Sequence, residues 1–204
     1  MSSGCPPNFP YKVTPGETLF AIALRFKTTV AALIKNNPGI NPDQLNSGQE
    51  ILVPLTGQGE IYPVESGSVT RIFVSQLYKV VFLYPAGWLR VADERYEGPD
   101  GFFQVSAVKG RSLEEVCREE AFHILKPYGA KPGIRRLTIQ QQQSCIIHPS
   151  ADQQAEMKGQ AVLIARYPQP VIISGCSYQF LVLWADKNHL QDLSSTLEFL
   201  FPSC

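Results

Sequence analysis

The run Phe180–Trp184 constrains the fold of this chain more than any other stretch of its sequence. Successive side chains of a strand point to opposite faces, and in this run both faces are apolar. A strand of that kind is normally covered on both sides. One multistranded sheet with two helices can provide the cover, so we expect residues 62–204 to fold as an α/β sandwich.

The strands of this region are expected to form a mainly antiparallel sheet. Most connections between them are short and contain proline or glycine, whereas a parallel crossover needs about a dozen residues or more. Alternation and turn residues predict strands at Tyr78–Tyr84, Trp88–Val91, Gly101–Val108, Arg136–Gln141, Ser144–Ile147, Gln160–Tyr167, Val171–Ser174 and Tyr178–Trp184.

Two helices are predicted to lie on the faces of this sheet. The first spans Ser112–Lys126, where Ser112 and Glu115 match a capping box and Pro127 prevents continuation. The second spans Asn188–Phe201. Apolar residues at helical spacing form one face of each helix, namely Leu113, Val116, Cys117, Ala121 and Ile124 in the first and Leu190, Leu193, Leu197 and Leu200 in the second.

Residues 9–55 follow a strand–helix–helix–strand pattern, so the whole chain is expected to be α+β. Thr18 and Thr29 can each cap a helix, because a hydroxyl there can accept a hydrogen bond from a first-turn N–H. The segment Asn36–Gly39 ends the second helix, since proline cannot continue it and glycine accepts positive φ. The strands are expected at Tyr11–Val13 and Glu50–Pro54.

Several motifs occur in a fixed order within residues 11–54. The run YKVTPGETLFAIALRF places a Pro-Gly-Glu-Thr turn after the first strand, an Asn-Pro pair follows the second helix, and the segment ends in Gly-Gln-x-Ile-x-Val-Pro. In these features the segment resembles a LysM domain. The resemblance implies a βααβ module that binds glycans containing N-acetylglucosamine, such as peptidoglycan or a chitin-like polymer.

The resemblance also implies where the glycan binds. A groove would lie between the loop after the first strand and the loop before the second, where glycines let the backbone approach a ligand. Ile40 would pack against the acetamido methyl group of a sugar. One wall would consist of Pro15, Gly16, Glu17, Thr18 and Leu19, and the other of Asn37, Pro38, Gly39, Ile40 and Asn41.

Two positions depart from the family pattern. Glu17 stands where the family more often has aspartate. Some relatives from spore-forming bacteria pair a Cys-Pro near the start with a cysteine in the closing strand. Here Cys5 and Pro6 are present, but Leu52 occupies the partner position, so Cys5 is expected to be free.

The second region is similar in its order of elements to the PsbP-like fold. An opening hairpin with the pattern Tyr84-Pro85-Ala86-Gly87-Trp88 precedes a helix, a meander and a final helix. Proteins with that fold have diverse roles, so the resemblance implies a scaffold or interaction domain and no particular reaction.

The chain therefore divides into a LysM module at 9–55, a linker at 56–61 and a larger domain at 62–204. The linker is expected because Thr56–Glu60 is glycine-containing, polar and without large apolar groups. No second copy of the module is present, so the chain is not a tandem array.

Charge and hydropathy exclude two classes of partner. The chain has 18 basic and 18 acidic residues and a formal net charge of zero. A nucleic-acid binder needs a basic stripe, and an anionic membrane surface also attracts basic proteins, so neither partner is expected. The longest apolar stretch, Val171–Ala185, is too short and too polar to span a bilayer.

No targeting segment is expected either, because Met1–Pro10 has no apolar core and the first basic residue is Lys12. We therefore expect synthesis in the cytoplasm. The LysM resemblance adds an expectation of deposition on the spore or the cell wall.

The five cysteines match no disulfide framework of a small secreted domain. We expect Cys117, Cys145 and Cys176 to be buried thiols, and Cys5 and Cys204 to lie near the termini, where either could form an intermolecular bond. The alternative is a zinc site built on the Cys145-x-x-His148 spacing, with Cys117, His123 and Cys176 as further candidate ligands. Cysteine is commonly a buried apolar residue, so neither a metal nor a cofactor is expected.

Two functional hypotheses follow. The first is a non-catalytic binding protein that attaches to glycan through its LysM module and presents the second domain to a protein partner. The second is a peptidoglycan-modifying hydrolase with its active site in residues 62–204. Phosphate-loop, zinc-protease and serine-nucleophile motifs are absent from the sequence, and the carboxylates available for glycoside cleavage cluster in one loop, namely Asp93, Glu94, Glu97 and Asp100. The first hypothesis is preferred, because charged loop residues are usually just solvated.

Overall fold

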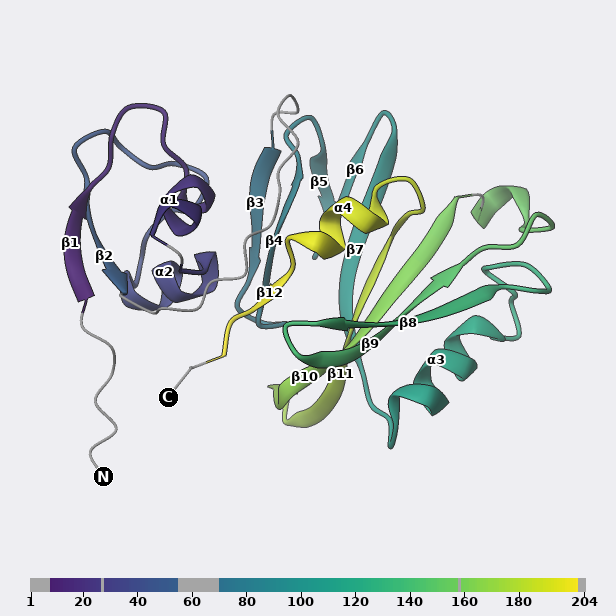
Figure 1. Cartoon of the computed structure of the whole chain (residues 1–204). Helices are drawn as coiled ribbons and strands as arrows, with labels where there is room; N and C mark the ends of the chain where they lie inside the picture. The colour runs from purple at the N-terminus through teal and green to yellow at the C-terminus, as the bar shows by residue number, and fades with distance from the viewer. Residues whose placement is uncertain (1–7, 27, 55–69, 158, 202–204) are drawn as a thin grey trace.

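The computed structural model describes residues 8–26, 28–54, 70–157 and 159–201. The expected linker at 56–61 lies outside these ranges, as do Cys5 and Cys204. Figure 1 shows a small N-terminal module beside a larger body made mainly of antiparallel strands. The expected α+β class is confirmed. None of the helices within the described ranges is long and apolar enough to cross a membrane.

The N-terminal module has the predicted βααβ order. Its elements are β1 (Asn8–Lys12), α1 (Leu19–Arg25), α2 (Val30–Asn36) and β2 (Glu50–Pro54), with β1 antiparallel to β2. Both predicted caps are confirmed, because the hydroxyls of Thr18 and Thr29 accept hydrogen bonds from Ala21 N–H at 3.1 Å and Ala32 N–H at 3.0 Å. Local sequence therefore determines both helix starts.

The larger body contains a seven-stranded antiparallel sheet in the order β5-β6-β7-β11-β10-β9-β8. The predicted apolar run forms the middle of β11, and its two faces enter two different cores. Leu181 and Leu183 face one core, and Phe180 and Val182 face the other, as the sequence requires. The strands of this sheet are β5 (Leu89–Ala92), β6 (Arg95–Gly98), β7 (Gly101–Val108), β8 (Gly133–Ile139), β9 (Gln142–His148), β10 (Gln160–Ile173) and β11 (Cys176–Asp186).

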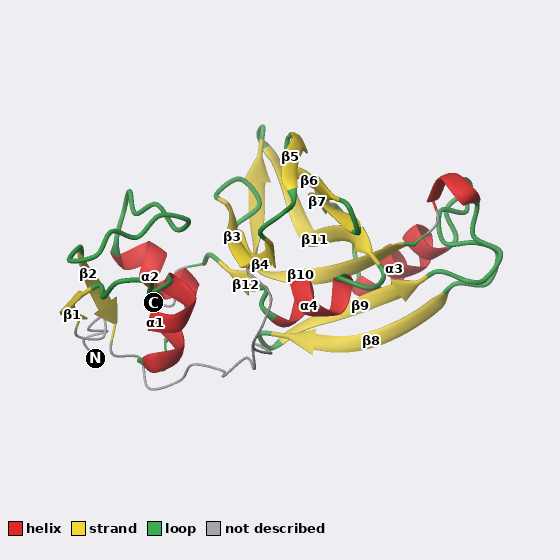
Figure 2. Cartoon of the chain, turned by 90° about the horizontal axis from the view of Figure 1, so that it is seen from above, coloured by secondary structure: helices red, strands yellow, loops and turns green. Residues whose placement is uncertain are grey.

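Helix α3 (Leu113–Ala121) covers one face of the sheet. The opposite face is covered by α4 (Leu190–Ser195) together with a three-stranded sheet in the order β12-β4-β3. This second sheet, formed by β3 (Thr70–Ser75), β4 (Val80–Pro85) and β12 (Glu198–Phe199), stands between the large sheet and the N-terminal module in both views (Figures 1 and 2).

Strand β4 is apolar on both faces. Val80, Phe82 and Tyr84 enter the core beneath the large sheet. Val81 on the opposite face is buried in one continuous core with the module, and Ile72 of β3 joins it there. The module therefore supplies the second cover that this hairpin needs.

Two polar contacts accompany this packing. The Glu198 carboxylate, from β12, accepts a hydrogen bond from Ala31 N–H in the first turn of α2 at 2.9 Å, and its residue is only 4% exposed. The Asp43 carboxylate accepts one from Ile72 N–H at 3.1 Å and so occupies a donor on the outer edge of β3. Hydrophobic burial and two hydrogen bonds from backbone N–H groups thus connect the module to the small sheet.

The predicted final helix is wrong beyond Ser195. Helix α4 ends there, and Glu198 and Phe199 pair instead with Val81 and Val80 of β4. The leucine spacing is compatible with a longer helix, but pairing with a strand distant in sequence overrides it. Thr196 joins the same hairpin, since its hydroxyl accepts a hydrogen bond from Leu83 N–H at 2.9 Å.

Other boundaries also differ from the sequence prediction. Helix α3 ends at Ala121 and not at Lys126, and Ile124, which was assigned to its apolar face, is 88% exposed. The two strands predicted in 160–174 form the single strand β10, with an irregularity between Arg166 and Val171. Strands β3 and β6 were not predicted.

The expectation of three buried thiols is wrong. Cys117 of α3 and Cys145 of β9 form a disulfide that ties the helix to the sheet, and Cys176 is exposed and free. The Cys145-x-x-His148 spacing therefore holds no free thiolate for a metal. Within the described ranges, no three histidine, cysteine, aspartate or glutamate side chains gather as a metal site would require.

Glu198 should make stability depend on pH. Burial raises the pKa of Glu198 to about 7 from 4.5, so the folded protein keeps a proton that the unfolded chain releases. Protonated Glu198 therefore contributes fully to the free energy of unfolding below pH 4.5. This contribution, roughly 3 kcal/mol, is lost as the pH rises through 7. Urea unfolding of the wild type and Glu198→Gln should show this loss in the wild type alone.

The exposed glutamate Glu119 on α3 supplies a matched control, since Glu119→Gln removes a carboxylate far from the junction. That variant should keep the pH dependence of the wild type. Identical pH profiles for the wild type and Glu198→Gln would contradict the proposed burial of this carboxylate.

Candidate glycan-binding site

Two exposed loops of the module come together at one of its ends. The loop between β1 and α1 carries Gly16, and the longer loop between α2 and β2 carries Gly39 (Figure 1). They are tied where they meet the strands, because Val13 N–H donates to Gln49 O and Gly48 N–H donates to Val13 O, both at 2.8 Å. The arrangement is a pair of loops on a rigid base.

Both glycines adopt backbone conformations that other residues rarely take. Gly16 has φ +79° and Gly39 has φ +86°, and an added Cβ would meet nothing within 4 Å at either position. Because neither glycine has a side chain and the space beside each is empty, a ligand can approach the main-chain groups there. The predicted wall residues that are exposed are Pro15, Gly16, Thr18, Pro38, Gly39 and Asn41, and Ile40 is half-buried.

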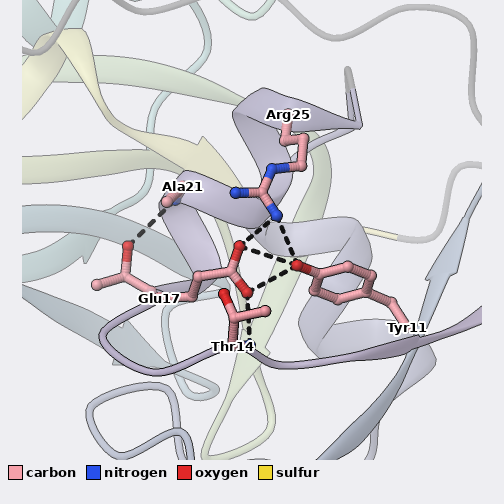
Figure 3. Close-up of polar contacts among 6 residues, drawn as sticks. Tyr11, Thr14, Glu17, Ala21 and Arg25 are labelled. Carbon is pink, nitrogen blue, oxygen red and sulfur yellow. Dashed lines mark hydrogen bonds and ion pairs between the residues drawn. The ribbon is translucent and has the colours of Figure 1, made fainter. Parts of the chain in front are cut away.

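Glu17 holds the first loop from inside (Figure 3). Its carboxylate accepts hydrogen bonds from Thr14 N–H at 2.8 Å and from the Tyr11 hydroxyl at 2.7 Å, and it pairs with Arg25 at 2.5 Å. The Thr14 N–H contributes most to lowering the pKa of Glu17 to about 2, and Tyr11 and Arg25 act in the same direction. The side chain is 8% exposed, so its position favours shaping the loop over touching a sugar.

Asn37 holds the second loop in place through hydrogen bonds of its side-chain amide. Its amide nitrogen donates to Leu33 O and Leu52 O, each at 2.8 Å, and its amide oxygen accepts from Leu52 N–H at 2.7 Å. These bonds link the end of α2 to β2. Leu19 is fully buried, so only its main chain could face a ligand. Three of the ten predicted site residues thus point their side chains inward.

Two depressions flank these loops where the module meets the small sheet. One, of about 780 Å³, contains Pro38, Gly39 and Ile40 of the second wall together with Lys79 and Leu200 of the larger body. The other, of about 330 Å³, contains Thr18 of the first wall together with Asp43, Arg71 and Leu83. Pro42 lines both. Sequence reasoning missed the residues from the β3–β4 hairpin and from the segment after β12, because they reach the site only through tertiary packing.

The carboxylates considered for a hydrolase lie on the β5–β7 meander, and each has a polar partner. Asp93 pairs with Arg90 at 2.7 Å and Glu97 with Arg95 at 2.6 Å. Glu94 accepts a hydrogen bond from the Ser75 hydroxyl, and burial raises the pKa of its carboxyl. Asp100 accepts from Trp88 Nε1–H at 2.8 Å and lies 3.2 Å from His189 Nε2. Each of the four carboxylates thus already has a polar partner within the chain.

Comparison with protein families identifies the module. Residues 11–54 match the family model described as LysM domain. This segment is therefore a LysM domain, a non-catalytic module, as its motifs indicated.

Three curated proteins share this segment. The chain is 52% identical over 44 residues to a Bacillus licheniformis protein named as an L,D-transpeptidase, YkuD, 44% identical over 48 residues to the cortical fragment-lytic enzyme of Bacillus subtilis, and 45% identical over 58 residues to the endolysin of Bacillus phage PZA. The matches cover 22%, 24% and 28% of this chain. The chain spans only 27%, 11% and 22% of those relatives, respectively, so their activities are not carried over.

Two solved structures are similar over most of the chain. The Ran-binding protein Mog1p of Saccharomyces cerevisiae is 11% identical, with a TM-score of 0.37 and coverage of 66% of this chain and 97% of that one. The cyanobacterial PsbP of Synechocystis is 12% identical, with a TM-score of 0.39 and coverage of 69% and 98%. A PsbP structure is thus among the neighbours. At these scores neither structure supports an inference about role.

Replacing Glu17 should loosen the first loop. The pKa of this carboxyl is lowered, so its contribution to stability is present above pH 4.5 and is lost as the pH falls through 2. Acid unfolding of Glu17→Gln should lack that loss, and at neutral pH the variant should be less stable than the wild type. The matched control is Glu97→Gln, which also removes an arginine-paired carboxylate but lies outside the module. Equal loss of stability below pH 4.5 in the wild type and Glu17→Gln would refute the role of Glu17.

Proposed function

We propose that the chain is a non-catalytic binding protein that attaches through residues 11–54 to glycan containing N-acetylglucosamine, in peptidoglycan or spore cortex. The observation that carries this proposal is the LysM match over the segment whose two loops are exposed and open. Deposition on the spore or cell wall belongs to the same proposal. It is supported by the similarity to an enzyme named for the cortex.

The chemistry of the loops fits an acetylated amino sugar. Such a ligand presents amide and hydroxyl groups, which main-chain donors and acceptors at Gly16 and Gly39 can bind at close range. The amide of Asn41 and the apolar side chain of Ile40 lie in the same loop. A single module offers little contact area, so its affinity should be weak and attachment should depend on many sites along the polymer.

The alternative is a hydrolase with its active site in the larger body. The three relatives are named as enzymes, and this favours the alternative, but the shared segment is the LysM domain. The paired carboxylates of the β5–β7 meander favour the binding role. Release of soluble fragments from purified peptidoglycan by the full chain would establish the alternative.

Point substitutions test the binding site better than deletion of the module, since deletion would uncover Val81 and Ile72. Ile40→Ala should lower retention on purified peptidoglycan and on chitin roughly fivefold, or about 1 kcal/mol, by removing apolar contact with the acetamido methyl. The control is Ile172→Ala, the same change at a 66% exposed position of β10. Unchanged retention of Ile40→Ala on both polymers would count against this groove.

A further inference from the structure

The larger depression is shared between the module and the larger body. Pro38, Gly39 and Ile40 belong to the second wall of the proposed glycan groove, and Val74 and Leu200 come from the small sheet and the segment after it. A ligand held by the second wall would therefore extend directly into this space of about 780 Å³.

The shape of this depression depends on a fixed junction. Glu198 and Asp43 each accept a hydrogen bond from a backbone N–H across it, and Val81 is 2% exposed within the shared core. On the far side, Leu200 N–H donates to Lys79 O at 2.9 Å, which fixes the end of the β3–β4 hairpin. Hydrogen bonds and a shared core thus connect the two sides of the depression.

The charge of the lining has one sign. Its charged residues are Lys35 of α2 and Lys79 of the hairpin, on opposite sides of the depression. The carboxylates of Asp43 and Glu198 are already engaged by backbone donors, since Asp43 accepts from Ile72 N–H and Glu198 accepts from Ala31 N–H. The Lys79 ammonium donates to the Gln76 amide oxygen at 3.4 Å, which is a weak contact.

An apolar floor between two cations suits a ligand that carries both methyl groups and carboxylates. Chitin has acetamido methyls but no carboxylate. Peptidoglycan carries short peptides on alternate sugars, and these contain methyl-bearing residues and free carboxylates. We propose that this depression binds the peptide attached to the glycan, and that the chain therefore prefers peptide-bearing peptidoglycan to bare glycan. This inference rests on the proposed function of the loops.

Three soluble ligands of equal sugar length test the proposal with the full chain: a peptide-bearing peptidoglycan fragment, the same fragment after enzymatic removal of its peptide, and an N-acetylglucosamine oligomer. The wild type should bind the first about fivefold to thirtyfold more tightly than the others, with the difference shrinking at high salt. Lys79→Ala and Lys35→Ala should each lower the ratio of the two affinities about fivefold. Both should leave binding of the uncharged N-acetylglucosamine oligomer unchanged. The peptide-free fragment keeps the lactyl carboxylate of its muramic acid, so both variants should weaken its binding less than that of the peptide-bearing fragment.

Two controls separate charge from folding. Lys79→Arg retains the cation and should keep most of the preference, while Lys187→Ala removes an exposed lysine of the larger body outside the depression and should behave as the wild type. Equal binding of all three ligands by the wild type would overturn the inference, and so would equal weakening of all three by Lys79→Ala. If the wild type bound none of the three ligands, that result would contradict the proposed function itself.

Discussion

The β3–β4 hairpin has two apolar faces, and each face needs a separate core. One face packs beneath the large sheet through Phe82 and Tyr84, and the other packs against the LysM domain through Ile72 and Val81. Leaving the second face in water would expose a contiguous apolar surface, which is unfavourable in proportion to its area. The LysM domain is therefore part of the fold of the chain as well as its proposed binding module, and its orientation toward the larger body follows from this packing.

The sequence predicts best the features that depend on local chemistry. Both helix caps of the module and the apolar run Phe180–Trp184 are where we expected them. The features that were wrong depend on distant partners, as in β12, which replaces the end of a predicted helix because it pairs with β4. The double-sided burial argument applied to Phe180–Trp184 also applies to Val80–Tyr84 and could have indicated that something covers the hairpin.

In the candidate site, too, some features follow from local sequence and others depend on residues distant in the chain. Motifs place the two loops, and hydrogen bonds explain why Glu17 and Asn37 belong to them without facing a ligand. Sequence alone could not add Lys79 or Leu200, because these residues approach the second loop only after the module has packed on the hairpin. The larger body completes a depression that the module begins, and through it we propose that the body contributes to recognition.

The protection of one backbone amide tests the packing of the module on the hairpin most directly. The N–H of Ile72 lies on the outer edge of β3 and donates to Asp43 across the junction, so its hydrogen exchange should be slow, comparable to that of Leu183 in the large sheet. Exchange at the rate of a free strand edge, with Leu183 still protected, would contradict the account.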